Sequence, residues 1–248
     1  MLRLLGHIFA VLVLTLLTQL GGLAWLLAQV FRRKLAGFLL AYVALSVSAV
    51  FVAPSFGRVA LSCFDQGPLQ VQSGLYCALN RTYVAPQLRD VLHDVAQQMD
   101  QQYPGTVTVV LDGNFPFFDG FPLLPHLSHD DGDKVDLAFY YRDAAGYLPG
   151  ATRSPLGYFA FEDGPTDCPP RWLTLRWDLA PLQSLWRDYA PDVPRNAALL
   201  RLLTQDDRVG RTFVEPHLAQ TWGVSHPKIR FQGCRAARHD DHIHTQLK

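Results

Sequence analysis

Three of the nine histidines lie within six residues near the C-terminus, and they are the residues best suited to chemistry. They are His239, His242 and His244. If residues 241–247 form a strand, His242 and His244 project from the same face, because side chains alternate sides along a strand. Two adjacent imidazoles are poor core material but frequent metal ligands. Alone, such a pair is more typical of a solvated histidine cluster, so a metal site needs a further ligand.

A second group of polar residues precedes a predicted strand in the middle of the chain. His129 ends a long loop (112–133) rich in glycine, proline and aspartate, and Asp136 follows between two apolar residues. The aspartates after His129 could form a solvated turn or a calcium loop, but the bidentate acid that a calcium loop needs is missing. Together, His129, Asp136 and His244 supply the three protein ligands of a catalytic zinc ion whose fourth position is open to water.

These two groups, in this order, resemble the signature of a known class of zinc peptidases. The pattern H-x-x-G-x-x-x-D from His129 to Asp136, followed much later by H-x-H, resembles that of the LAS-type peptidases, which include lysostaphin, D-Ala-D-Ala carboxypeptidases and the hedgehog signalling domain. The chain resembles in particular the penicillin-insensitive murein endopeptidases. Their pattern continues as H-x-x-H-x-H, which His239, His242 and His244 reproduce. The resemblance covers about residues 105–247, and its specific motifs are two short blocks.

The resemblance implies a role for each of these residues. His129, Asp136 and His244 would be the zinc ligands, His242 the catalytic histidine beside the metal-bound water, and His239 a supporting histidine. The family often has a serine two residues before the first ligand, whereas Leu127 occupies that position here. This departure puts a contact around the ligands in doubt, but not the ligands themselves.

The function that the resemblance implies is a zinc metallopeptidase that hydrolyses peptide cross-links or stem peptides of peptidoglycan through a zinc-activated water. The ligand set by itself indicates only metal-assisted hydrolysis. One alternative is a catalytically silent, zinc-containing domain that binds peptidoglycan or acts as a scaffold. Another is a different metallohydrolase, such as a phosphoesterase, which would need a second metal ion.

Two uncharged, largely apolar runs at the N-terminus predict a membrane anchor. Residues 4–31 and 35–52 are each about long enough for one spanning helix, and Arg32, Arg33 and Lys34 separate them. We therefore expect a two-helix transmembrane hairpin over residues 1–54, with its basic turn in the cytoplasm and both ends outside. The alternative is a cleaved signal peptide followed by a buried helix. The length of the first run and the lack of a small-residue cleavage site disfavour it.

The cysteines agree with an extracytoplasmic domain. All four follow the predicted hairpin, at Cys63, Cys77, Cys168 and Cys234. In an oxidising compartment they would form two disulfides, in one of three pairings, and a Cys63–Cys77 bond would close a short loop. No C-x-x-C spacing suggests a thiolate zinc or redox site. We expect the anchor in a bacterial inner membrane and the domain in the periplasm.

Composition sets outer limits on these interpretations. The chain has 248 residues, of which 49% are hydrophobic and 18% charged, and this excludes a disordered protein. The net charge is zero, but residues 1–58 carry five basic groups and no acidic group, so the remainder is net negative. A net-negative domain argues against nucleic-acid binding. Only two glutamates are present and the zinc-protease motif H-E-x-x-H is missing.

The elements predicted after the hairpin indicate an α+β domain (84–248) joined by an irregular tether (55–83). The apolar spacing from residue 86 to 103 is helical, and residues 106–111 have the composition of a strand. Residues 144–170 read as irregular. The further predicted elements are helices at 180–189, 195–204 and 211–222 and strands at 134–141, 228–232 and 241–247. We expect a small antiparallel sheet with flanking helices that carries a mononuclear zinc site.

Overall fold

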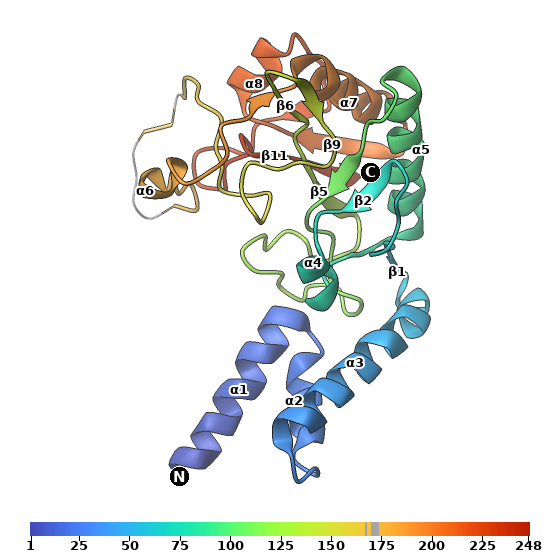
Figure 1. Cartoon of the computed structure of the whole chain (residues 1–248), viewed down its shortest axis with the longest axis vertical. Coiled ribbons are helices and arrows are strands. Elements are labelled where there is room, and N and C mark those ends of the chain that lie inside the picture. Colours follow the sequence, from blue (N-terminus) through green and yellow to red (C-terminus); the bar gives the residue numbers. More distant parts are fainter. Residues whose placement is uncertain (167, 170–173) are drawn as a thin grey trace.

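Three apolar helices stand below an α+β domain in the computed structural model (Figure 1), which describes residues 1–166, 168–169 and 174–248. The helices are α1 (Leu2–Thr18), α2 (Gly21–Ala28) and α3 (Lys34–Val52), and a 3-10 turn, η1 (Ala53–Phe56), extends α3. Among the described residues, one helix is long and apolar enough to cross a membrane, and it comprises α3 and η1. The predicted α+β fold class is confirmed.

The first apolar run does not form the single helix expected of a two-helix hairpin. The chain reverses at Gln19, which has a φ of 63°, and α2 runs back along α1. Two glycines permit this close return, because a Cβ on Gly22 would lie 1.9 Å from Thr15 Oγ1. Hydropathy cannot detect the reversal, since both sides of it are apolar.

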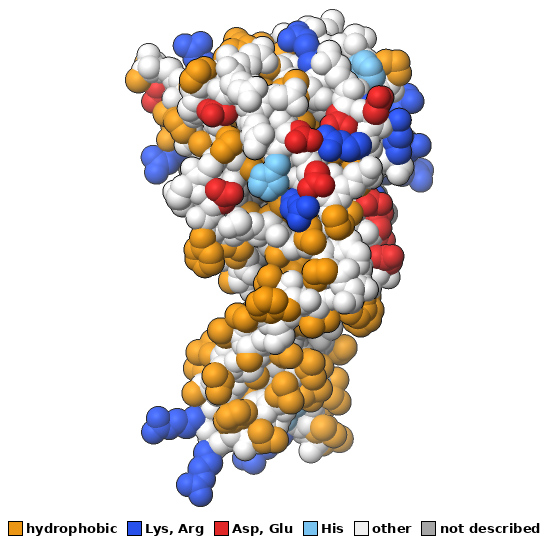
Figure 2. All heavy atoms as spheres, turned by 90° about the vertical axis from the view of Figure 1, so that its right-hand side faces the viewer, with side chains coloured by type: hydrophobic (Ala, Val, Ile, Leu, Met, Phe, Trp, Pro, Cys, Tyr) orange, Lys and Arg blue, Asp and Glu red, His pale blue; other side chains and the backbone are white. Residues whose placement is uncertain are grey.

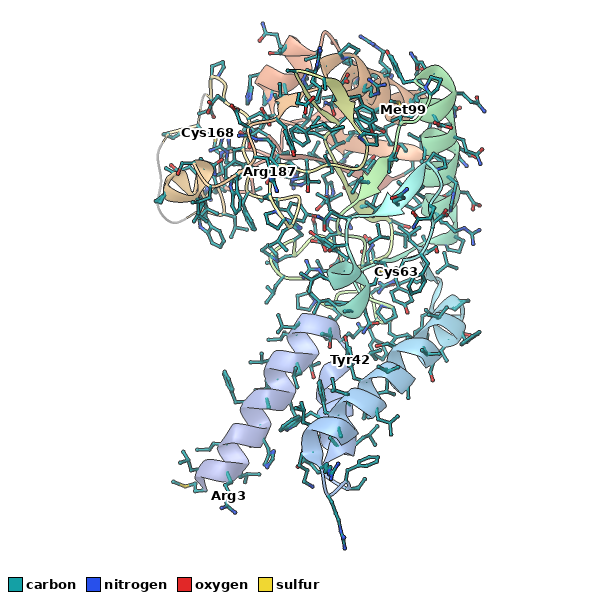
Figure 3. All side chains as sticks on the ribbon, in the orientation of Figure 1. Arg3, Tyr42, Cys63, Met99, Cys168 and Arg187 are labelled. Carbon is teal, nitrogen blue, oxygen red and sulfur yellow. A yellow bond between two sulfur atoms is a disulfide. The ribbon has the colours of Figure 1, made fainter. Side chains whose placement is uncertain are left out.

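The reversal changes the expected position of the N-terminus. Arg3 and the turn between α2 and α3 lie at the same end of the helices, remote from the domain (Figures 1 and 3). The prediction of an outward-facing N-terminus is therefore not supported. With Arg3 beside the basic turn, the charges at that end of the anchor all have one sign, as the positive-inside rule requires of a cytoplasmic end.

A six-stranded sheet forms the centre of the domain, in the order β10-β9-β11-β5-β4-β2. Its strands are β2 (Leu69–Val71), β4 (Thr108–Val110), β5 (Lys134–Ala138), β9 (Val209–Phe213), β10 (Ile229–Arg230) and β11 (His242–Leu247). The four central strands are antiparallel, but β2 pairs with β4 and β10 with β9 in parallel. The expectation of a purely antiparallel sheet is thus wrong. Both edge strands are reached through a helical crossover, which parallel pairing requires.

The segment predicted to be a tether is part of the folded unit. Residues 55–83 contribute strand β2 to the sheet, together with β1 (Val59–Ala60), α4 (Gly74–Ala78) and the first residue of β3 (Tyr83–Val84). These elements have two to five residues, too short for a periodic pattern to emerge among the glycines and prolines. The predicted disulfides are confirmed, and the pairing is Cys63–Cys77 and Cys168–Cys234.

Two helices carry the core on the sheet. Helix α5 (Pro86–Gln102) matches the predicted helix and buries its apolar face at Leu88, Val91, Leu92, Val95 and Met99. Helix α7 (Val193–Gln205) begins at Asp192, whose side chain accepts a hydrogen bond from the Arg195 amide. Val135, Leu137 and Ile243 meet them from the strands.

Two predicted helices are wrong at least in part. Residues 211–222 divide into strand β9 and a short helix, α8 (Pro216–Thr221), because Pro216 cannot continue a helix but can begin one. The helix expected over 180–189 is limited to α6 (Ala180–Gln183). A small second sheet consists of β6 (Tyr141–Asp143), β7 (Gly146–Leu148) and β8 (Ala190–Pro191).

Arg58, which follows the anchor directly, holds the long loop between β4 and β5. We call residues 111–133 the ligand loop, because the proposed ligand His129 lies in it. The Arg58 side chain is buried and donates to three backbone carbonyls and one carboxylate: Phe115 O (2.7 Å), Phe117 O (2.9 Å), Asp130 O (3.0 Å) and Asp119 Oδ1 (2.6 Å). One side chain thus ties both ends of the loop to the base of the domain.

Replacing Arg58 with methionine is expected to destabilise the folded chain by about 3 kcal/mol or more, because each buried acceptor left without a donor costs about 1–3 kcal/mol. The measurement is thermal unfolding of the full chain in detergent. Arg89→Met is the matched control, because the Arg89 side chain forms an exposed pair with Asp90 and such pairs contribute about 0–1 kcal/mol. Equal losses in the two variants would contradict a holding role for Arg58.

Candidate metal centre

The two central strands bring two of the proposed ligands side by side. Strands β5 and β11 are antiparallel neighbours, and Asp136 lies opposite His244 in their register. Ile243 points to the other face and is fully buried in the core. His242 and His244 therefore share the face that carries Asp136, as a strand requires.

Three atoms from three segments converge on one point. His129 Nε2 lies 3.1 Å from His244 Nδ1 and 3.2 Å from Asp136 Oδ1, and His244 Nδ1 lies 2.8 Å from the same oxygen. Ligands at 2.0–2.1 Å from a tetrahedral zinc ion are about 3.3 Å apart. All three side chains are buried. The set has the donor types and spacing of a site for a divalent metal ion.

Neighbouring groups fix which atom each ligand presents. The Nδ1 of His129 lies 2.8 Å from the Gly113 carbonyl, a contact in which Nδ1 donates and the lone pair of Nε2 remains for the centre. The Tyr158 hydroxyl donates to Asp136 Oδ2 at 2.7 Å, and Oδ1 faces the histidines. Metal-binding histidines and carboxylates in proteins are oriented by contacts of this kind.

His242 lies beside this group but has a different partner. Its Nε2 is 3.7 Å from Asp136 Oδ1, and its Nδ1 is 2.5 Å from Asp241 Oδ1. The other oxygen of Asp241 accepts the Phe159 amide, which holds this carboxylate in place. Burial works to lower the pKa of His242, but the carboxylates of Asp136 and Asp241 outweigh it and raise this pKa to about 9. These two carboxylates therefore orient His242 beside the centre and favour its protonated form.

His239 completes the histidine cluster from the same C-terminal motif. Its ring lies 4.9 Å from that of His242 and 5.7 Å from that of His244. Among the described residues its buried Nδ1 has no hydrogen-bond partner. Burial and the neighbouring imidazoles lower the pKa of His239 well below its usual value, so the ring is neutral. It can donate to or accept from a bound molecule without bringing a charge.

His126, which lies three residues before the first of the two sequence motifs, also belongs to the centre. Its Nδ1 is 3.2 Å from Asp136 Oδ2 and 3.0 Å from Asp112 Oδ2. Arg81 forms a two-pronged ion pair with Asp112, at 2.5 and 2.7 Å. His126, Asp136 and His242 form a second group that could hold a metal ion. The sequence contains a pattern that could have indicated His126, because His126-x-x-His129 repeats the spacing of His239-x-x-His242.

Charge within the cluster favours a cation at the shared carboxylate. Burial would raise the pKa of Asp136, but His129, His242 and His126 hold this pKa well below its usual value. Burial lowers the pKa of His244 to about 4, so its imidazole is neutral at pH 7. An ionised carboxylate and a neutral imidazole are the forms that bind a metal ion.

Replacing Tyr158 with phenylalanine is expected to weaken zinc binding about 10- to 100-fold, as the loss of groups that orient metal ligands typically does. The hydroxyl that holds Asp136 Oδ2 would be lost, while the ring would still fill its buried place. Competition with a zinc chelator measures the affinity. Tyr103→Phe, on a half-buried tyrosine outside the cluster, should leave zinc affinity unchanged. An unchanged affinity in Tyr158→Phe would argue against the assigned position of the metal.

Comparison with known proteins adds no assignment to this geometry. No protein-family model matches the chain, and no curated protein matches it.

Proposed function

We propose that the protein is a membrane-anchored, zinc-dependent peptidase that cleaves stem peptides or cross-links of peptidoglycan. One observation carries the proposal: His129, Asp136 and His244 converge within 3.2 Å, with His242 oriented beside them. The order and spacing of the same residues resemble the LAS-type zinc peptidases. Geometry and motif thus support one set of ligands.

His129 Nε2, Asp136 Oδ1 and His244 Nδ1 would hold the zinc ion. When bound there, zinc supplies a water of lowered pKa and polarises the carbonyl of the scissile bond. Three protein ligands are the usual number in catalytic zinc sites, and four are usual in structural sites. The donor set therefore fits a catalytic role better than a structural one.

His242 would act as the general base. Its Nε2 faces the shared carboxylate, and Asp241 holds the opposite nitrogen. Once a dication offsets the charge of Asp136, the strongest of the effects that raise the pKa of His242 is removed, and those of Asp241 and Asp112 remain. The pKa of His242 then falls towards neutrality, where a neutral imidazole is available. His242 would accept a proton from the attacking water and return it to the leaving amine. The neutral His239 beside it would donate to the oxygen on which negative charge develops.

Location supports a cell-wall substrate. A helix able to span a membrane precedes the domain, and the basic residues of the anchor lie at the end remote from the domain. Two disulfides indicate an oxidising compartment. We place the domain on the periplasmic side of a bacterial inner membrane, where peptidoglycan is within the same compartment.

A two-metal hydrolase is the second candidate, and one observation favours it. His126, Asp136 and His242 form a second group, and Asp136 is common to both groups. Two-metal sites occur in phosphatases and nucleases, among other hydrolases, and phosphate-ester hydrolysis is the reaction we assign to this second candidate. In that case His242 would be a ligand and could not serve as the base. The ratio of metal to protein separates the two candidates.

The test uses the purified full chain in detergent, because a fragment that starts at residue 59 would lack Arg58. Zinc content and release of soluble fragments from purified peptidoglycan are measured together, and product masses identify the bond. One zinc per chain with peptide-bond cleavage supports the proposal. Zinc without cleavage points to a binding or scaffold domain, two metals with phosphoester cleavage support the second candidate, and absence of zinc overturns the site.

A further inference from the structure

The end of the candidate spanning helix sets the level of the membrane surface on the domain. The span from Lys34 to Phe56 has 23 residues, and a helix of that length is about 35 Å long. The hydrocarbon core of a bilayer is about 30 Å thick. If Lys34 lies at one surface, Phe56 lies at the other. Arg58, two residues later, then marks the base of the domain.

No linker separates this surface from the metal centre. Arg58 donates to the carbonyl of Asp130, the residue next to His129. At the top of α1, the Gln19 side chain forms two hydrogen bonds with the backbone of Phe117, at 2.6 and 2.9 Å. The ligand loop is therefore fastened directly to the anchor at two points. The metal centre cannot move away from the membrane without breaking these contacts.

The base of the domain also exposes apolar side chains around the anchor. We call Phe56, Phe64, Leu75 and Phe118 the apolar underside; Phe64 is 90% exposed and Phe118 62% exposed. The Phe56 ring contacts those of Phe117 and Phe118, with centroids 4.9 and 5.6 Å apart. Figure 2 shows hydrophobic side chains continuing from the helices onto the base of the domain. Such surfaces are typical of membrane contact.

An apolar groove joins the underside to the span. It has a volume of about 550 Å³ and lies between α3 and the loop closed by Cys63–Cys77. Val43, Val47 and Val50 line it from the helix, and Leu61 and Phe64 from the domain. Because the helix side of this groove belongs to the candidate span, the acyl chain of a bilayer lipid would fill the groove. The domain thus borders lipid and does not stand clear of it.

From this arrangement we propose that the substrate is a peptide held at the membrane surface by its own lipid anchor, and not the distant, mature wall. This inference rests on the proposed peptidase function and names its substrate class. A domain on a flexible tether samples a volume set by the length of the tether. A centre fastened to the end of its own spanning helix meets only what lies at that surface. Lipid-linked stem peptides satisfy this condition.

The first experiment compares substrates that differ only in their distance from the bilayer. The zinc-loaded full chain is reconstituted in phospholipid vesicles with one stem peptide, either free or coupled to a lipid through spacers of increasing length. We expect the shortest spacer to give the fastest cleavage, about 100-fold faster than micromolar free peptide, because co-anchoring gives a local concentration in the millimolar range. Cleavage should slow as the spacer lengthens.

A matched variant separates rigid attachment from simple anchoring. This variant combines a long flexible glycine–serine segment, inserted between Gly57 and Arg58, with Gln19→Ala and Tyr42→Phe. Arg58 stays with the domain, and the side-chain hydrogen bonds of Gln19 and Tyr42 that fasten the domain to the anchor are removed. This variant should cleave the free peptide and lose the preference for short spacers. If the unmodified chain cleaves all spacers and purified peptidoglycan equally well, the inference is overturned and the peptidase function stands. If it cleaves no peptide at all, the proposed function itself fails.

A second experiment measures the position of the underside without any activity. Phe118→Cys and Ala144→Cys are spin-labelled in the reconstituted full chain. Ala144 is exposed and directly follows β6, a strand that lies at the end of the domain remote from the anchor (Figure 1). The label at position 118 should be accessible to oxygen dissolved in lipid and protected from a water-soluble nickel relaxant. The label at position 144 should be accessible to the nickel relaxant and less accessible to oxygen. Equal access of the nickel reagent to both labels would contradict a membrane-facing underside.

Discussion

Zinc content is expected to fall from about one ion per chain to nearly none when His244 is replaced by alanine, because the site would keep only two of its three protein ligands. Nδ1 of His244 is the atom that approaches both other ligand atoms, at 3.1 and 2.8 Å. Hydrolysis should be lost together with the metal. Elemental analysis of the purified full chain after dialysis measures the effect.

His93→Ala is the matched control for this loss. His93 lies on α5, outside both candidate metal groups, so its removal should leave zinc content and hydrolysis unchanged. Far-ultraviolet circular dichroism and intact disulfides would show that the His244 variant still folds. Zinc bound at wild-type affinity in a folded His244→Ala protein would disprove this ligand set.

The His242→Ala variant should keep its zinc but lose turnover about 100- to 10,000-fold, the usual contribution of a general acid–base group. The reason lies in the geometry: His242 Nε2 is 3.7 Å from Asp136 Oδ1, farther than either ligand nitrogen, and Asp241 holds its other nitrogen. The two measurements are zinc stoichiometry and the rate of peptide-bond cleavage at saturating substrate.

His126→Ala is the informative companion to this variant. If the metal ion occupied the group formed by His126, Asp136 and His242, both substitutions would remove zinc. With the metal at His129, Asp136 and His244, neither substitution should remove it. Parallel loss of zinc in both variants would therefore reassign His242 from base to ligand.

The parts of the site that could be predicted depend on the spacing of residues that are close together in the sequence. His242 and His244 are two residues apart on one strand, so their common face follows from strand geometry alone. Helix α5 was equally predictable, because five apolar residues repeat at helical intervals. In both cases the pattern and the structure extend over the same few residues.

The parts that could not be predicted depend on contacts between distant segments. Nothing in the sequence distinguishes Gln19 from other polar residues. In the folded chain its side chain forms two hydrogen bonds with the backbone of Phe117, 98 positions later. Tyr158 lies in the segment 144–170 that was expected to be irregular, and its role appears only where its hydroxyl contacts Asp136. Strand β2 has three residues and is defined by its parallel partner β4, not by its own composition. No single-sequence pattern contains such information.

The three proposed ligands differ in how much of the fold must open before each can leave its position. Asp136 and His244 are 108 positions apart but belong to adjacent central strands, whose separation would require unfolding of the whole sheet. His129 lies in a loop that is attached through side-chain contacts, and such loops open with far smaller free energies than sheet cores. Metal exchange would therefore follow the opening of this loop and proceed much faster than global unfolding. Because Arg58 and Gln19 close that loop from the anchor side, the residence time of an ion bound at the proposed site would depend on the contacts between the domain and the anchor as well as on the ligands.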